Sequence, residues 1–154
     1  MQANKQSLVT GSGLFPGTAT VTDVHCAIDP DGSGAVVIPS TWTRVPNSAF
    51  TKCAALSSVT FQAPVQVTAI DAYAFYESGL ASFVVPQSVS SIGASAFELC
   101  SSLTSLTLEA DSALVSISDR LFYGSGLTSF VVPKSVSSID ASAFELCSSL
   151  TSLT

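Results

Sequence analysis

Residues with the chemistry of a nucleophile occur together near the start of the chain, where His25 precedes Cys26. A histidine can accept the proton of a cysteine thiol and so generate the thiolate that attacks a substrate. Such catalysis also needs a group that orients the histidine and donors that stabilise the product of the attack. The spacing assigns no carboxylate to His25, and no glycine-rich nucleophile turn is present. We therefore interpret His25 as a surface or capping histidine and predict no enzyme activity.

A second group has the residue types of a calcium loop. Asp29, Asp31 and Ser33 supply oxygen atoms at its first, third and fifth positions, and Gly34 occupies the sixth. The twelfth position is Ser40, where a calcium loop needs a glutamate that binds the ion with both oxygens. A tight turn between two strands explains the same residues. Asp29, Asp31 and Ser33 are therefore an incomplete calcium candidate, and we predict no cofactor.

An internal repeat determines the elements that would position these residues. Residues 87–107 and 134–154 are identical at 19 of 21 positions and lie 47 residues apart. Phenylalanines recur through the chain at intervals of 25, 22, 25 and 22 residues, at Phe50, Phe75, Phe97, Phe122 and Phe144. A period of this length is typical of a solenoid, in which each coil stacks on its neighbours.

Each coil is predicted to contain one strand and one short helical segment. In Leu103-x-x-Leu106-x-Leu108, apolar and polar residues alternate with the period of a strand whose leucines face inward. The segments 94–100 and 141–147, both ASAFELC, favour a helix or a 3-10 turn on the opposite side of the coil. We expect about five coils of 22–25 residues over 35–154, with the last coil truncated, and an N-terminal β cap over 1–34 that includes a strand at 18–24.

Three of the four cysteines follow the same repeat. Cys53, Cys100 and Cys147 are 47 residues apart and therefore lie two coils from one another. Coils two apart are separated by roughly 10 Å, whereas a disulfide needs Cα atoms within about 7 Å. We predict that all three are free thiols that fill apolar space, so the fold needs no oxidising compartment. Cys26 has no partner at this interval and is either free or bonded outside the chain.

Composition limits the possible partners. Only 10% of residues are charged, and the formal net charge is −6. Nucleic acid and anionic membrane surfaces both require a basic patch, so neither is expected as a partner. No run of apolar residues is long enough for a transmembrane helix.

The recurring pattern Val/Ile-Pro-x-Ser-Val-x-Ser-Ile-x-x-x-Ala-Phe-x-x-Cys-x-x-Leu-x-Ser-Leu resembles the BspA-like leucine-rich repeats over residues 35–154. The resemblance implies a right-handed leucine-rich-repeat α/β solenoid with a parallel β-sheet on one face. It also implies an extracellular or cell-surface protein that acts in adhesion or protein recognition. No signal peptide is visible in residues 1–13.

The residues that alternate with the inward-facing side chains form two outward rows on the predicted sheet. One row is all serine, the other is all β-branched, and neither carries a charge or an aromatic anchor. Ser and Thr could simply tile a regular sheet, or the rows could form a low-charge face that docks onto proteins. We predict a protein-binding face that consists of Ser58, Thr60, Ser82, Val84, Ser105, Thr107, Ser129 and Val131.

Three functions are compatible with this face. The first is a non-catalytic protein-binding scaffold, which the resemblance favours. The second is a structural subunit of a filament or larger assembly, whose partners are copies of itself or other subunits. The third is a surface that orders water, as in ice binding, but valines in alternate coils interrupt the Ser-x-Thr pattern that this function would use.

Overall fold

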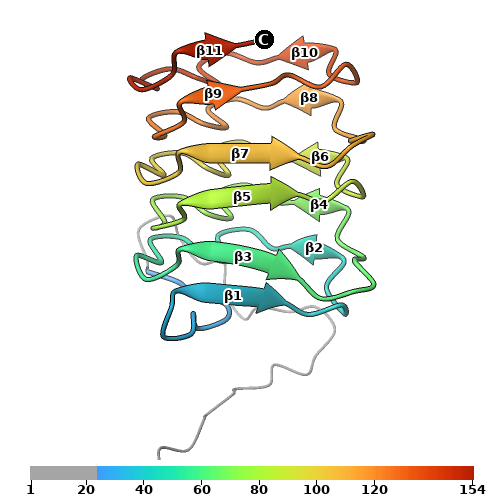
Figure 1. Cartoon of the computed structure of the whole chain (residues 1–154), viewed down its shortest axis with the longest axis vertical. Coiled ribbons are helices and arrows are strands. Elements are labelled where there is room, and N and C mark those ends of the chain that lie inside the picture. The colour runs from blue at the N-terminus through green and yellow to red at the C-terminus, as the bar shows by residue number, and fades with distance from the viewer. Residues whose placement is uncertain (1–23) are drawn as a thin grey trace, which may run out of the picture.

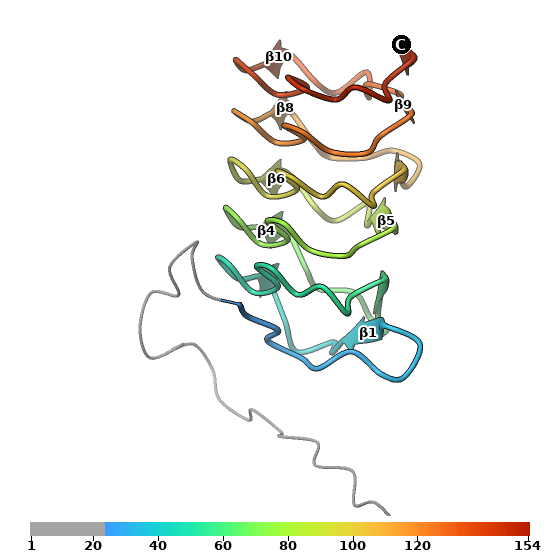
Figure 2. The ribbon, with the colours of Figure 1, turned by 90° about the vertical axis from the view of Figure 1, so that its left-hand side faces the viewer.

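The computed structural model describes residues 24–154, which form a stack of β-coils (Figure 1). Each coil contributes a strand to one side of the stack, called here the sheet face, and a two-residue strand to a second side, the short-strand face (Figure 2). The sheet face contains β1 (Ala35–Ile38), β3 (Ser58–Phe61), β5 (Ser82–Val85), β7 (Ser105–Leu108), β9 (Ser129–Phe130) and β11 (Ser152–Leu153). The short-strand face contains β2 (Arg44–Val45), β4 (Ala69–Ile70), β6 (Ser91–Ile92), β8 (Ser116–Ile117) and β10 (Ser138–Ile139).

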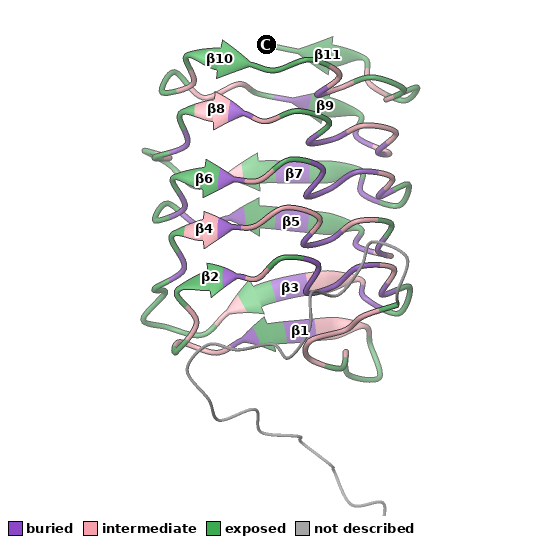
Figure 3. Ribbon diagram, turned by 180° about the vertical axis from the view of Figure 1, so that it is seen from behind, coloured by how far each residue is buried: buried purple, intermediate pink, exposed green. Residues whose placement is uncertain are grey.

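Neighbouring coils pair their strands in parallel and in phase. On the sheet face β1 pairs with β3, β5 with β7, and β9 with β11, and the short-strand face holds the ladders β2-β4-β6 and β8-β10. The register sets Val36 opposite Val59 and Phe83 opposite Leu106. Inward residues therefore lie above inward residues, and these positions are buried in every coil except the last (Figure 3). The parallel solenoid expected from the repeat is confirmed, while its right-handed winding stays a prediction.

The phenylalanines that revealed the repeat form a continuous column in the core. The rings of Phe50 and Phe75 lie 5.3 Å apart, those of Phe75 and Phe97 5.2 Å, and those of Phe97 and Phe122 5.8 Å. The Phe122 and Phe144 rings continue the column at 5.3 Å. All but Phe144 are almost completely buried. Each coil therefore places one ring on the ring of the coil before it, which explains the interval in the sequence.

The helical segments predicted at 94–100 and 141–147 are wrong: both are consecutive turns. Ser95 and Leu99 have φ of 58°, in the left-handed region, so the chain cannot continue as a helix through either residue. The N–H groups of Ser95, Phe97 and Leu99 instead donate to carbonyls of the next coil. We call the equivalent segments 48–53, 73–78, 95–100, 120–125 and 142–147 the turn ladder. Across residues 24–154 no helix has the length and apolar character needed to cross a membrane.

Spacing explains why the helix propensity of ASAFELC is overridden. An α-helix with its side chains is about 10 Å wide, whereas paired strands bring adjacent coils to within about 4.8 Å. Helices on every coil would therefore separate one side of the stack. The turn ladder keeps the narrow spacing, because its backbone bonds run between coils as they do in the sheets, for example from Phe97 N to Leu121 O at 3.0 Å.

The described part of the predicted cap, residues 24–34, continues the turn ladder by one rung. The His25 N–H donates to Thr51 O and the Ala27 N–H donates to Ala49 O, both at 2.7 Å. This pairing brings Cys26 to Cys53, with Cα atoms 5.4 Å apart, and the two form a disulfide. The predictions of a free thiol at Cys53 and of a Cys26 that is free or bonded outside the chain are therefore wrong, because the repeat interval says nothing about a cysteine that lies outside the repeat. Residues 1–23 and most of the predicted 18–24 strand lie outside the described residues.

Candidate protein-binding face

The predicted binding residues lie side by side on the sheet face, as the strand alternation requires. Ser82, Ser105 and Ser129 are exposed, and Ser58 at the N-terminal end of the row is half-buried. The second row is exposed throughout and consists of Thr60, Val84, Thr107 and Val131. Val59, Phe83, Leu106 and Phe130, which alternate with these residues, are at most 7% exposed.

The second row exposes apolar surface without any charge. Val84 is 50% exposed and Val131 is 68% exposed, and Val37 on β1 extends the same row at 58%. Covering a charged side chain removes its hydration, whereas covering valine and threonine methyl groups is favourable. This arrangement can therefore dock against another surface at a small cost of desolvation.

The sheet face is interrupted by two grooves. No strand pair joins β3 to β5 or β7 to β9 within the described residues, and a groove lies at each of these junctions. The β7/β9 groove measures about 650 Å³ and the β3/β5 groove about 210 Å³. Both follow a coil with a long corner, because seven residues separate β3 from β4 and β7 from β8, whereas five separate β5 from β6. Each of these long-cornered coils pairs in register with the short-cornered coil before it and not with the one after it.

The calcium candidate forms a hydrogen-bonded turn before β1. The Asp31 Oδ1 atom accepts bonds from the Ser33 hydroxyl at 2.6 Å, the Ser33 N–H at 2.8 Å and the Ala35 N–H at 3.0 Å. These bonds, above all that from the Ser33 hydroxyl, lower the pKa of Asp31. Among the described residues no three His, Cys, Asp or Glu side chains gather in a group that could hold a metal ion. Calcium binding at Asp29, Asp31 and Ser33 stays a prediction.

The cysteine beside His25 is not available as a nucleophile. The Cys26 sulfur beside His25 is bonded to Cys53 and carries no thiol. Cys100 and Cys147 are free, as predicted. The Cys100 thiol donates to Phe75 O at 2.9 Å, and burial raises its pKa to about 11. At neutral pH it is a protonated, buried filler.

Sequence reasoning missed a cluster of aromatic and charged side chains on the turn ladder. The Arg120 guanidinium lies 4.5 Å from the ring centre of Tyr123 and 3.6 Å from Glu98 Oε1. Tyr73 and Tyr76 meet edge to face, with ring centres 5.9 Å apart. The signal was present in the sequence, since the residue after each core phenylalanine is Thr51, Tyr76, Glu98, Tyr123 or Glu145.

The parallel coils, the phenylalanine column and the exposed sheet face define a solenoid of the leucine-rich-repeat class. The family model described as BspA type leucine rich repeat region matches residues 33–152 in six copies. The chain therefore belongs to this family, and its leucine-rich repeats form a scaffold of the kind found in BspA-type surface antigens. Leucine-rich repeats generally act as non-catalytic scaffolds that mediate protein interactions.

Solved structures of bacterial leucine-rich-repeat proteins share the fold. The pneumococcal vaccine antigen PcpA is 29% identical, with a TM-score of 0.70, over 80% of this chain and 32% of that one. A leucine rich cell surface protein from Faecalibacterium prausnitzii is 28% identical, with a TM-score of 0.58, over 78% and 38%. A protein from Bacteroides capillosus is 26% identical, with a TM-score of 0.53, over 82% and 83%.

The first two of these proteins are much longer than this chain, which spans about a third of each. A comparison with curated proteins finds no significant relative.

Proposed function

We propose that this chain is a non-catalytic protein-binding scaffold and that the sheet face contacts the partner. The observation that carries the proposal is the pair of exposed, uncharged rows, in which serine runs beside threonine and valine. Solenoids bind through long faces of this kind. The valines supply apolar area to the interface, and the hydroxyl groups supply hydrogen bonds.

We further propose that the scaffold works outside the cell, in adhesion or recognition. Two observations support this location. The Cys26–Cys53 disulfide is typical of proteins that fold in an oxidising compartment. The similar solved structures include a vaccine antigen and a cell surface protein.

A binding screen with two matched arginine variants tests the role of the sheet face. The purified chain is immobilised, and a panel of purified secreted and surface proteins is passed over it in biolayer interferometry. Ser82 is exposed on β5 in the sheet face, and Ser91 is exposed on β6 in the short-strand face. Ser82→Arg is expected to weaken the affinity for a true partner by about tenfold or more, because a long charged side chain would obstruct the sheet face. Ser91→Arg is expected to have no effect. Equal effects of the two variants would overturn the proposal.

Assembly with other copies is the second candidate, because the uncharged rows of the sheet face could also dock against the same rows of another chain. Light scattering over a range of micromolar concentrations separates the candidates, since a subunit would gain mass with concentration and a monomeric scaffold would not.

A further inference from the structure

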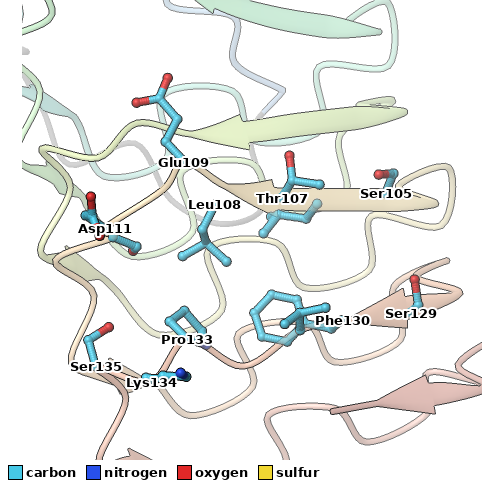
Figure 4. A pocket seen from close by; sticks show the side chains of 13 residues that line it. Ser105, Thr107, Leu108, Glu109, Asp111, Ser129, Phe130, Pro133, Lys134 and Ser135 are labelled. Carbon is cyan, nitrogen blue, oxygen red and sulfur yellow. The ribbon is translucent and has the colours of Figure 1, made fainter.

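The groove between β7 and β9 has three chemically distinct parts along its length (Figure 4). Ser105 and Ser129 lie at one end, beside the outward serine row. Leu108, Phe130 and Pro133 lie in the middle. Charged and polar side chains form the other end: Glu109, Asp111, Lys134 and Ser135. The groove is therefore polar, then apolar, then charged along the direction of the strands.

We propose that this groove binds an extended segment of a partner protein that carries an aliphatic side chain and, two residues away, a lysine or arginine. The aliphatic side chain fills the apolar middle, and the basic side chain pairs with Glu109 and Asp111. Residues two apart on an extended segment project to the same side, so one segment can reach both parts. This proposal rests on the proposed function, since it assigns a partner chemistry to the sheet face.

The charged end selects for a cation. It contains two carboxylates and one ammonium group, which leaves a formal net charge of −1. Glu109 and Asp111 are exposed, and neither takes part in an ion pair among the residues that the structure describes. The Glu109 Oε2 atom accepts the Gln87 N–H at 2.8 Å, which turns that carboxylate toward the coil of β5, at the edge of the groove (Figure 4). A basic side chain in the groove would therefore meet Asp111, with the oriented carboxylate of Glu109 at the edge of the groove.

The equivalent groove between β3 and β5 shows which residues make the difference. It lies 47 residues earlier in the repeat and has about 210 Å³ instead of about 650 Å³. Phe61 takes the position of Leu108, and its larger ring packs edge-on against Phe83 with centres 6.1 Å apart. The positions of Glu109 and Asp111 are held by uncharged Gln62 and Pro64. Glu109 lines both grooves, so the β7/β9 groove is distinguished by its open apolar middle and by Asp111.

Two matched peptides test the proposal on the whole chain by NMR. The probes are acetyl-Gly-Ser-Leu-Ser-Lys-Gly-amide and the same peptide with glutamate in place of lysine, each titrated into the ¹⁵N-labelled protein. The lysine peptide is expected to shift the amide signals of 105–112 and 129–135 and to bind about fivefold to tenfold tighter than the glutamate peptide. The preference is expected to shrink at raised ionic strength. Equal affinities, or shifts that lie elsewhere, would overturn the proposal.

Two variants and one control separate the parts of the groove. Glu109→Gln with Asp111→Asn is expected to remove the preference for lysine. Leu108→Phe copies the residue found at the equivalent position, so it should fold, and it is expected to weaken both peptides by filling the middle. Phe61→Leu alters the other groove and should leave the titration unchanged. An unchanged titration with Leu108→Phe would exclude the β7/β9 groove as the site.

Failure of this proposal can be distinguished from failure of the proposed function. Ser82 lines neither groove, so Ser82→Arg tests the sheet face alone. If a partner no longer binds Ser82→Arg but still binds Leu108→Phe, the scaffold function stands and the proposal that the β7/β9 groove is the binding site is overturned. A partner that tolerates both variants would overturn the two proposals together.

Discussion

The phenylalanine column makes a quantitative prediction about Phe97. Its side chain is fully buried and has ring neighbours on three sides, with Phe75, Phe83 and Phe122 at 5.2, 5.3 and 5.8 Å. Replacing a buried phenylalanine with alanine costs about 3–5 kcal/mol through lost transfer energy and the cavity left behind. Two of these neighbours are stacked, so the cavity would break the column in the middle. We expect Phe97→Ala to lie in the upper half of that range.

Phe144→Ala is the matched control, since the residue has the same position two coils later. Phe144 is half-buried and has two ring neighbours, Phe122 at 5.3 Å and Phe130 at 5.5 Å. Folding buries less apolar surface of this ring, and the cavity left by its removal would open to solvent. We therefore expect a cost of about 2 kcal/mol.

Urea unfolding followed by circular dichroism measures both variants. Solenoids can unfold in parts. The slope of each variant's unfolding free energy against urea concentration must therefore match that of the parent chain before the free energies are compared. A cost for Phe97→Ala no greater than that for Phe144→Ala would refute the idea that a continuous buried column holds the coils together.

Three further predictions concern the cysteines and one glycine. Reducing the Cys26–Cys53 disulfide, which spans 27 residues, is expected to lower the free energy of unfolding by about 3–4 kcal/mol, measured by thermal unfolding with and without reductant. Burial raises the pKa of the Cys100 thiol from 9.0 to about 11, so between these pH values the native state holds a proton that the unfolded state loses. The contribution of this thiol to stability should therefore fall as pH rises from about 9 to 11. A Cys100→Ala variant that keeps the same alkaline loss of stability in denaturant titrations would contradict this. Gly79→Ala would set a Cβ atom 2.2 Å from Ala54 O, and the clash should cost about 1–3 kcal/mol in urea unfolding, whereas no loss would mean that the coils can separate locally.

The stacking of the coils could be predicted because equivalent residues recur in the sequence at a nearly constant interval. The interval between phenylalanines fixed the coil length, and the alternation around Leu106 identified which side chains face inward. The turn ladder could not be predicted in the same way. The ASAFELC segment has helix-forming residues, but the distance to the neighbouring coil decides its conformation, and that distance is a tertiary property.

The disulfide and the groove depend on contacts outside the repeat. Cys26 has no equivalent in any coil, so its approach to Cys53 follows only from the additional rung that residues 25–27 add to the turn ladder. The β7/β9 groove follows a coil with two extra corner residues and has Leu108 where the equivalent coil has a phenylalanine. Neither feature is visible when the coils are treated as identical.

One of the two differences between residues 87–107 and 134–154 bears on where a ligand binds, and it leads to a prediction of stoichiometry. Gln87 is replaced by Lys134 in the wall of the β7/β9 groove, whereas the other difference, Gly93 to Asp140, lies after the short strands β6 and β10. The outward serine row, by contrast, is the same in both units. A ligand that recognised only the rows would therefore find similar sites along the whole sheet face, whereas one that recognises the groove finds a single site.

Counting the bound peptide distinguishes these two modes of recognition. Isothermal titration with the lysine peptide is expected to give one site per chain, since the Phe61 ring narrows the β3/β5 groove and Pro64 stands there at the position of Asp111. A Phe61→Leu, Gln62→Glu and Pro64→Asp variant rebuilds the second groove with the residues of the first and is expected to raise the stoichiometry to two. Two or more sites in the parent chain would mean that the repeated rows, and not the groove, determine where a partner binds.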